Sequence, residues 1–139
     1  MKEKIKYLPW KIVVLLALFA LLRPVNKMLA SLIGFEIPSE LSYVFTGIIA
    51  ITWVAVAVWR KIKAPICVLG FAGGLYAILS VAIAASMYYL FPEDQGETSL
   101  ISLLTVGLLF SVLFNVVWGG FLGYVTSIIQ RIMETRVSK

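Results

Sequence analysis

The stretch PICVLGFAGGLYAILSVAIAASMYYLF, residues 65–91, contains no charged side chain and no histidine. Residues 41–59 and residues 100–129 share this property. At about 1.5 Å of rise per helical residue, each of the three runs is long enough to cross the roughly 30 Å hydrocarbon core of a bilayer. The sequence therefore predicts three membrane-spanning helices between Leu41 and Ile129.

The composition also indicates a membrane protein. The chain has 139 residues, of which 61% are hydrophobic. A soluble chain of this length could not bury so much apolar surface, so we expect the lipid bilayer to cover part of it. We expect one four-helix membrane domain over residues 1–139. The net charge of +5 does not indicate nucleic acid, because the basic residues form short clusters at the ends of the runs.

The connections between the uncharged runs alternate in charge: residues 60–63 (RKIK) are basic, and residues 93–97 (EDQGE) are acidic. If four spans place both termini on one side, that side holds ten of the twelve basic residues, and only Arg23 and Lys27 fall on the other. Short loops rich in Lys and Arg stay in the cytoplasm. The prediction is an all-α integral membrane protein. It has four transmembrane helices in an antiparallel bundle, short loops and cytoplasmic N and C termini, as a multi-pass protein of the cytoplasmic (plasma) membrane.

The first span is the least regular of the four. Residues 7–22 are apolar but short, and Pro24 disfavours a helical conformation at Arg23. In one interpretation the span ends with that range, and residues 28–35 form a short segment in the outer interface. In the other, a kinked helix continues to about Gly34 and carries two cations into the outer half of the membrane. We favour the first, because a charge deep in lipid costs several kcal/mol unless it is paired.

The kinked alternative has a functional consequence. Arg23, Asn26 and Lys27 are three and four residues apart, so they would share one helical face. A cationic face near the outer leaflet could bind a lipid headgroup phosphate or another anion. The interpretation we favour is that Arg23 and Lys27 simply lie among the headgroups and end the helix.

The run 100–129 carries a small or polar residue at every fourth position. This ladder consists of Gly107, Ser111, Asn115, Gly119, Gly123 and Ser127. Gly70 and Gly74 offer a matching surface in the run 65–91. Small side chains let helices approach closely, and close packing drives helix association in lipid. We favour packing within the chain's own bundle, and the alternative is an interface for a homodimer or for a larger membrane protein.

Asn115 lies near the middle of its run, with Thr46, Thr52 and Ser111 as candidate partners. A polar amide at the centre of a bilayer needs a hydrogen-bond partner. We expect an interhelical hydrogen bond, or one to a second copy of the chain. The alternative is that the amide lines a pore or contacts a substrate.

The residue types argue against catalysis. The chain has no histidine, a single cysteine (Cys67) and a single aspartate, which lies in the acidic connection. The commonest zinc ligand and general base are therefore missing, and no base in the uncharged runs can activate a serine. We expect no enzymatic activity, no metal site and no cofactor.

The expected function is therefore one of association. We expect an accessory or regulatory subunit, or a homo-oligomer, that acts through contacts between helices without chemistry of its own. The alternative is a minimal transporter or channel, with an anion pathway, formed by a homodimer. Carriers coupled to protons or sodium usually hold a carboxylate inside the membrane, and the uncharged runs contain none.

Overall fold

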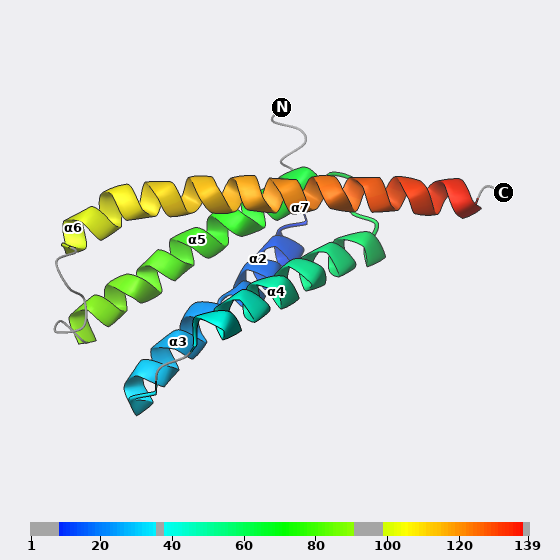
Figure 1. Cartoon of the computed structure of the whole chain (residues 1–139). Helices are drawn as coiled ribbons and strands as arrows, with labels where there is room; N and C mark the ends of the chain where they lie inside the picture. Colours follow the sequence, from blue (N-terminus) through cyan, green and yellow to red (C-terminus); the bar gives the residue numbers. More distant parts are fainter. Residues whose placement is uncertain (1–8, 36–37, 91–98, 138–139) are drawn as a thin grey trace.

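The computed structural model describes residues 9–35, 38–90 and 99–137, and these ranges are helical apart from short turns and ends (Figure 1). Four of the helices are long and apolar enough to cross a membrane, and they span Trp10–Ile33, Glu40–Trp59, Pro65–Leu90 and Leu100–Arg136. The second and third match the uncharged runs 41–59 and 65–91 to within one residue, and the fourth contains the run 100–129 but continues to Arg136. The elements are α2 (Trp10–Ala20), α3 (Leu22–Ile33), α4 (Ser39–Trp59), α5 (Pro65–Leu90), α6 (Leu100–Ser102), the π-helix η2 (Leu103–Gly107) and α7 (Leu108–Val137).

Pro24 kinks the first helix but does not end it. Helix α2 stops at Ala20, Leu21 forms a turn, and α3 continues through Pro24 to the left-handed Gly34 (φ 74°). A proline lacks an N–H, and its ring clashes with the carbonyl four residues earlier. That carbonyl belongs to Ala20, so the interruption falls one turn before the proline. The favoured expectation, that the helix ends before Pro24 and that residues 28–35 are a separate segment, is therefore wrong.

The most extensive helix pair is α5 with α7, which lie side by side in Figure 1. Three glycines make this approach close, because a Cβ atom at any of them would clash with the backbone of the facing helix. They are Gly73 against Asn115, Gly119 against Leu69, and Gly123 against Ile66. The central part of the ladder on α7 therefore faces α5 of the same chain.

The buried core lies at the end of the molecule where α2 and α5 begin and α4 ends. It includes Val13 and Leu16 of α2, Trp53 of α4, and Val68 and Leu69 of α5. At the opposite end the packing is looser, since α3 contributes no buried residue. There, α3 and the start of α4 extend away from α7 (Figure 1).

Hydrogen bonds from two side chains attach α4 and the residues just after it to neighbouring helices. The indole Nε1 of Trp53 donates to the carbonyl oxygen of Leu16 in α2, at 3.1 Å. The amide Nε2 of Gln130 in α7 donates to the carbonyl oxygens of Ala57 (3.1 Å) and Ile62 (3.4 Å), where α4 ends. Because these bonds join residues far apart in the sequence, they fix the position of α4 at the well-packed end.

Candidate functional site

A cavity of about 380 Å³ lies between the four long helices, and Tyr76 in its lining also packs against the buried core. Its polar lining residues can all donate hydrogen bonds. They are Arg23 and Lys27 of α3, Ser42 of α4, Tyr76 and Ser80 of α5, and Ser111 and Asn115 of α7, with Pro24 and Phe114 completing the lining. No acidic side chain is among these residues, so the lining described by the structure is cationic.

The two cations reach the cavity because the kinked helix continues past Pro24. Arg23 and Lys27 are one helical turn apart, which places them on the same face of α3. The guanidinium offers a planar fork of N–H donors, and the ammonium offers three more. Tyr76 and Ser80, which lie one turn apart on α5, add two hydroxyl groups to the lining. The cavity is thus suited to surround a negatively charged group.

Asn115 is held in place by its own helix. Its side-chain Nδ2 donates to the carbonyl oxygen of Ser111 at 2.8 Å, and Gly73 packs against its backbone. This bond stays within α7, so the expected interhelical hydrogen bond is not the one observed. A primary amide has two N–H donors. The second can therefore donate to a group in the cavity.

A smaller cavity of about 40 Å³ shares Arg23, Tyr76 and Asn115 with the larger one. Its remaining lining is Ala20, Thr46, Ile49, Trp53, Trp118 and Leu122. Trp53 and Leu122 are only 3% and 7% exposed. The polar space therefore narrows towards the apolar core, which closes it at the well-packed end.

The candidate residues predicted from the sequence fall into different environments. Arg23 and Lys27 line the large cavity, whereas Asn26 is half-buried and is not among its lining residues. Ser111 and Asn115 also line it, so the structure brings the predicted cations of α3 together with two residues of the ladder on α7. Of the remaining ladder residues, Gly107 has no close approach from a facing helix, because a Cβ there would meet only Leu103 and Ser102. The hydroxyl of Ser127 donates to the carbonyl oxygen of Gly123 at 3.0 Å.

On α5, the predicted Gly70 and Gly74 make ordinary or adjustable contacts with α7. A Cβ at Gly70 would meet the Val116 carbonyl oxygen at 3.6 Å, and one at Gly74 would meet the Val116 side chain at 3.1 Å. Gly73 is the residue that requires glycine. The closest approach of α5 to α7 in this region is therefore at Gly73, one residue before the predicted Gly74.

Sequence reasoning missed Ser42, Tyr76 and Ser80 as site residues. The signal for two of them was present, because Tyr76 and Ser80 are hydroxyl residues four apart in the middle of a mostly apolar run. Ser42 lies near the start of its run. Nothing in the local sequence associates it with the cations of α3.

Comparisons of the chain with protein-family models, curated proteins and solved structures give no match. A function therefore has to be inferred from the geometry of the cavity. Two cations, an amide and four hydroxyls suit an anion, because hydrogen bonds between charged partners are shorter and stronger than neutral ones.

Proposed function

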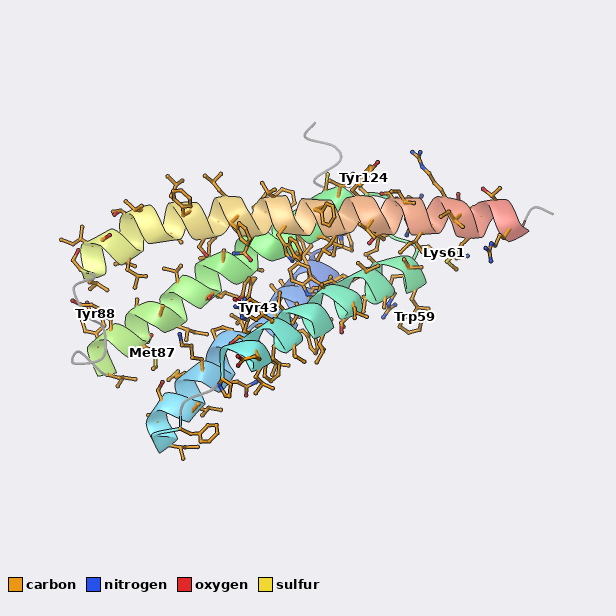
Figure 2. The ribbon with its side chains drawn as sticks, in the orientation of Figure 1. Tyr43, Trp59, Lys61, Met87, Tyr88 and Tyr124 are labelled. Atoms are coloured by element: carbon orange, nitrogen blue, oxygen red, sulfur yellow. The ribbon has the colours of Figure 1, made fainter. Side chains whose placement is uncertain are left out.

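We propose that this chain is a multi-pass protein of the cytoplasmic membrane that binds an anionic group between its four helices. The membrane location is supported by the four apolar helices and by the charge asymmetry of the connections. Aromatic side chains at both ends of the molecule agree with it. Trp59 lies beside Lys61 at one end and Tyr88 at the other (Figure 2), as expected for anchors at two interfaces.

An antiparallel bundle with both termini in the cytoplasm is part of this proposal. The contacts between α5 and α7 support it, because they run in opposite directions along the two helices. Asn115 meets Gly73, and Gly119, further along α7, meets Leu69, which is earlier in α5. Short connections between successive helices fit the same arrangement.

The observation that carries the proposal is the position of the two cations. Arg23 lies thirteen residues after the start of α2 at Trp10, which corresponds to about 20 Å along the helix. With Trp10 at the inner interface of a bilayer, as we propose, Arg23 and Lys27 would lie in the outer half of the hydrocarbon layer. Such charges cost several kcal/mol unless they are paired or face a polar cavity. Binding an anion in the cavity removes that cost.

In this arrangement the bound group enters from the outer side. The cations of α3 neutralise its charge, and the hydroxyls and the Asn115 amide fix its orientation. The core layer around Trp53 and Leu122 stops it from going further. We therefore propose a binding site, and transport would require the core layer to open or a second copy to complete the pathway.

Iodide quenching of tryptophan fluorescence tests this site, because iodide is both an anion and a quencher. In a Trp10→Phe/Trp59→Phe background the remaining Trp53 and Trp118 both line the smaller cavity. We expect iodide to quench them with a saturable affinity. Arg23→Gln with Lys27→Gln should weaken that affinity by about tenfold or more, since hydrogen bonds to charged groups contribute about 1.5–3 kcal/mol.

Two controls separate anion binding from simple access. Acrylamide, a neutral quencher, should act equally on the background and on the double variant. Arg60→Gln in the same background removes a cation that does not line the cavity, so it should leave iodide quenching unchanged. Iodide quenching that is linear in concentration, or unaffected by loss of the two cations, would contradict the proposed site.

Association remains a second proposed function, and one observation favours it. The outward surface of α7 carries large apolar residues at alternating spacings of four and three, all well exposed. They are Phe110, Phe114, Val117, Phe121, Tyr124 and Ile128. Because α5 already covers Gly119 and Gly123, this surface, and not the small-residue ladder, is the face by which α7 would bind a second copy or a larger membrane protein.

A further inference from the structure

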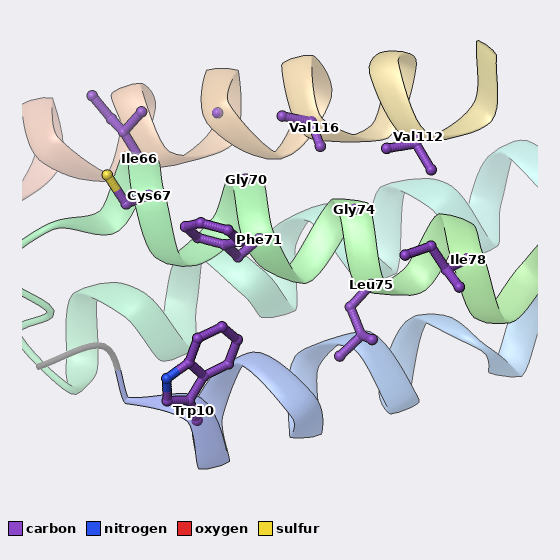
Figure 3. Close-up of a pocket in the computed structure, with 11 residues that line it drawn as sticks. Trp10, Ile66, Cys67, Gly70, Phe71, Gly74, Leu75, Ile78, Val112 and Val116 are labelled. Atoms are coloured by element: carbon purple, nitrogen blue, oxygen red, sulfur yellow. The ribbon is translucent and has the colours of Figure 1, made fainter. Parts of the chain in front are cut away.

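An apolar groove of about 520 Å³ lies on α5, separate from the cavity between the four helices (Figure 3). Gly70 and Gly74 of α5 and Gly120 of α7 form part of its lining, and larger apolar side chains border it. Trp10 and Phe71, whose ring centroids are 5.9 Å apart, also line it. A long apolar groove of this volume is suited to an apolar chain.

A polar cavity of about 320 Å³, distinct from the cavity that contains Arg23, lies where α4 connects to α5. Three cations line it, Lys61 and Lys63 from the connection and Arg131 from α7, together with one acid, Glu134. Pro65 lines this cavity and is followed directly by Ile66, which lines the apolar groove. The two spaces share no lining residue, but they adjoin consecutive residues at the start of α5.

Lys61 occupies a backbone position that normally favours glycine. Its φ of 48° is the only positive φ among the non-glycine residues that the structure describes. The backbone N–H of Lys61 donates to the carbonyl oxygen of Val58 (3.0 Å), and the N–H of Ile62 donates to the carbonyl oxygen of Ala57 (3.2 Å). Together these two hydrogen bonds form a Schellman cap at the end of α4. A side chain at this position costs free energy relative to glycine. A lysine here is explained if its charge is needed in the cavity.

We propose that an anionic phospholipid of the cytoplasmic leaflet binds here. Its phosphate lies among Lys61, Lys63 and Arg131, and one acyl chain follows the groove past Gly70 and Gly74. Basic pockets at the cytoplasmic ends of membrane helices recognise lipid phosphates in this way. The inference assumes the membrane orientation of the proposed function, but it uses no residue of the cavity around Arg23.

Native mass spectrometry of the full chain in a neutral detergent tests lipid selectivity. Dioleoyl phosphatidylglycerol and dioleoyl phosphatidylcholine serve as probes with identical acyl chains. We expect phosphatidylglycerol to be retained preferentially, and the triple variant Lys61→Gln/Lys63→Gln/Arg131→Gln to lower its retention about tenfold. A matched variant, Lys11→Gln/Arg60→Gln/Arg136→Gln, removes the same charge from residues outside the cavity, and it should retain the lipid like the unmodified chain.

The groove is tested separately through Gly120 and Cys67. A Cβ at Gly120 would meet nothing closer than the Ile66 side chain at 4.0 Å, so Gly120→Leu places its side chain in the groove without a backbone clash. We expect it to lower phosphatidylglycerol retention while the helical circular dichroism is unchanged. Cys67 is the only cysteine and is an exposed lining residue. Its modification by a maleimide should be slower in vesicles that contain phosphatidylglycerol than in phosphatidylcholine alone.

Three results would overturn the lipid site: equal retention of the two lipids, equal loss in the matched triple variant, or protection of Cys67 by glycerol phosphate as strong as that by phosphatidylglycerol. The last would show a soluble phosphate site instead of a lipid site. None of these results changes the iodide quenching governed by Arg23 and Lys27. A failure of the lipid site is therefore distinguishable from a failure of the proposed anion site.

Discussion

Two adjacent glycines of α7 differ in what an added methyl group would meet. A Cβ at Gly119 would clash with the backbone of Leu69, whereas one at Gly120 has open space around it. We expect Gly119→Ala to lower the free energy of unfolding by about 1–3 kcal/mol, the usual cost of overpacking. Gly120→Ala should raise it by up to about 0.5–1 kcal/mol, because glycine is a poor helix former.

Titration from a mild detergent into dodecyl sulfate, followed by far-ultraviolet circular dichroism, measures this difference. Each variant is the control for the other, since both change glycine to alanine in the same helical turn. If Gly119→Ala is as stable as Gly120→Ala, the backbone of α5 does not lie as close to Gly119 as the structure shows.

At the residue scale, the sequence indicates which side of α7 packs but not which residues of α5 receive it. The spacing of four identifies Gly119 and Gly123, and both lie against α5. Among Gly70, Gly73 and Gly74, every residue satisfies a small-residue pattern on its own helix. Only the position of the facing backbone, here the Asn115 carbonyl, selects Gly73. That position depends on tertiary packing, which a pattern within one helix does not contain.

At the scale of elements, the first helix shows where local rules are incomplete. The sequence correctly locates a disturbance near Pro24, but it does not predict that the helix resumes. A proline in the first turn of a new helix loses no hydrogen bond, because the first N–H groups of any helix lack intrahelical partners. Helix α3 begins at Leu22, so Pro24 lies within that turn. The continuation is what brings Arg23 and Lys27 to the cavity.

Helix α7 offers a test of association at the same scale. In a Cys67→Ala background, Val117→Cys places a thiol on its outward apolar surface, where Val117 is 70% exposed. If that surface binds a second copy, copper phenanthroline should cross-link Val117→Cys in native membranes to a dimer. Ile51→Cys on α4, from a site that is 72% exposed, is the matched control and should stay monomeric.

The result separates the two kinds of partner. A cross-linked product larger than a dimer of this chain would indicate a different membrane protein on the same surface. Equal cross-linking of Val117→Cys and Ile51→Cys would indicate random collision in the bilayer. In that case the heptad-like spacing of the apolar residues reflects lipid contact alone.

At the scale of the whole molecule, the cavity exists only because four helices meet. Arg23, Ser42, Tyr76 and Asn115 come from α3, α4, α5 and α7. The uncharged runs predict three of these helices with nearly correct limits, since burial in lipid leaves a strong compositional signal. Which polar residues face one another depends on helix rotation and packing, and composition carries little information about either.

The membrane orientation is the prediction on which the placement of both sites depends. Ser99, at the N-cap of α6, follows the acidic connection, whereas Thr135 lies five residues beyond Gln130, which contacts the end of α4. In the Cys67→Ala background we expect an impermeant maleimide to label Ser99→Cys in intact cells. Thr135→Cys should react only after permeabilisation, because Lys and Arg near a span are retained in the cytoplasm.

The parent Cys67→Ala chain should remain unlabelled under both conditions, and both single-cysteine variants should react fully in detergent. Labelling of both positions from the same side would mean that α7 does not cross the membrane. The reverse pattern, with Thr135→Cys labelled in intact cells, would place the cavity around Arg23 in the cytoplasmic half. The lipid phosphate among Lys61, Lys63 and Arg131 would then belong to the outer leaflet, so this one experiment determines which side each of the two sites faces.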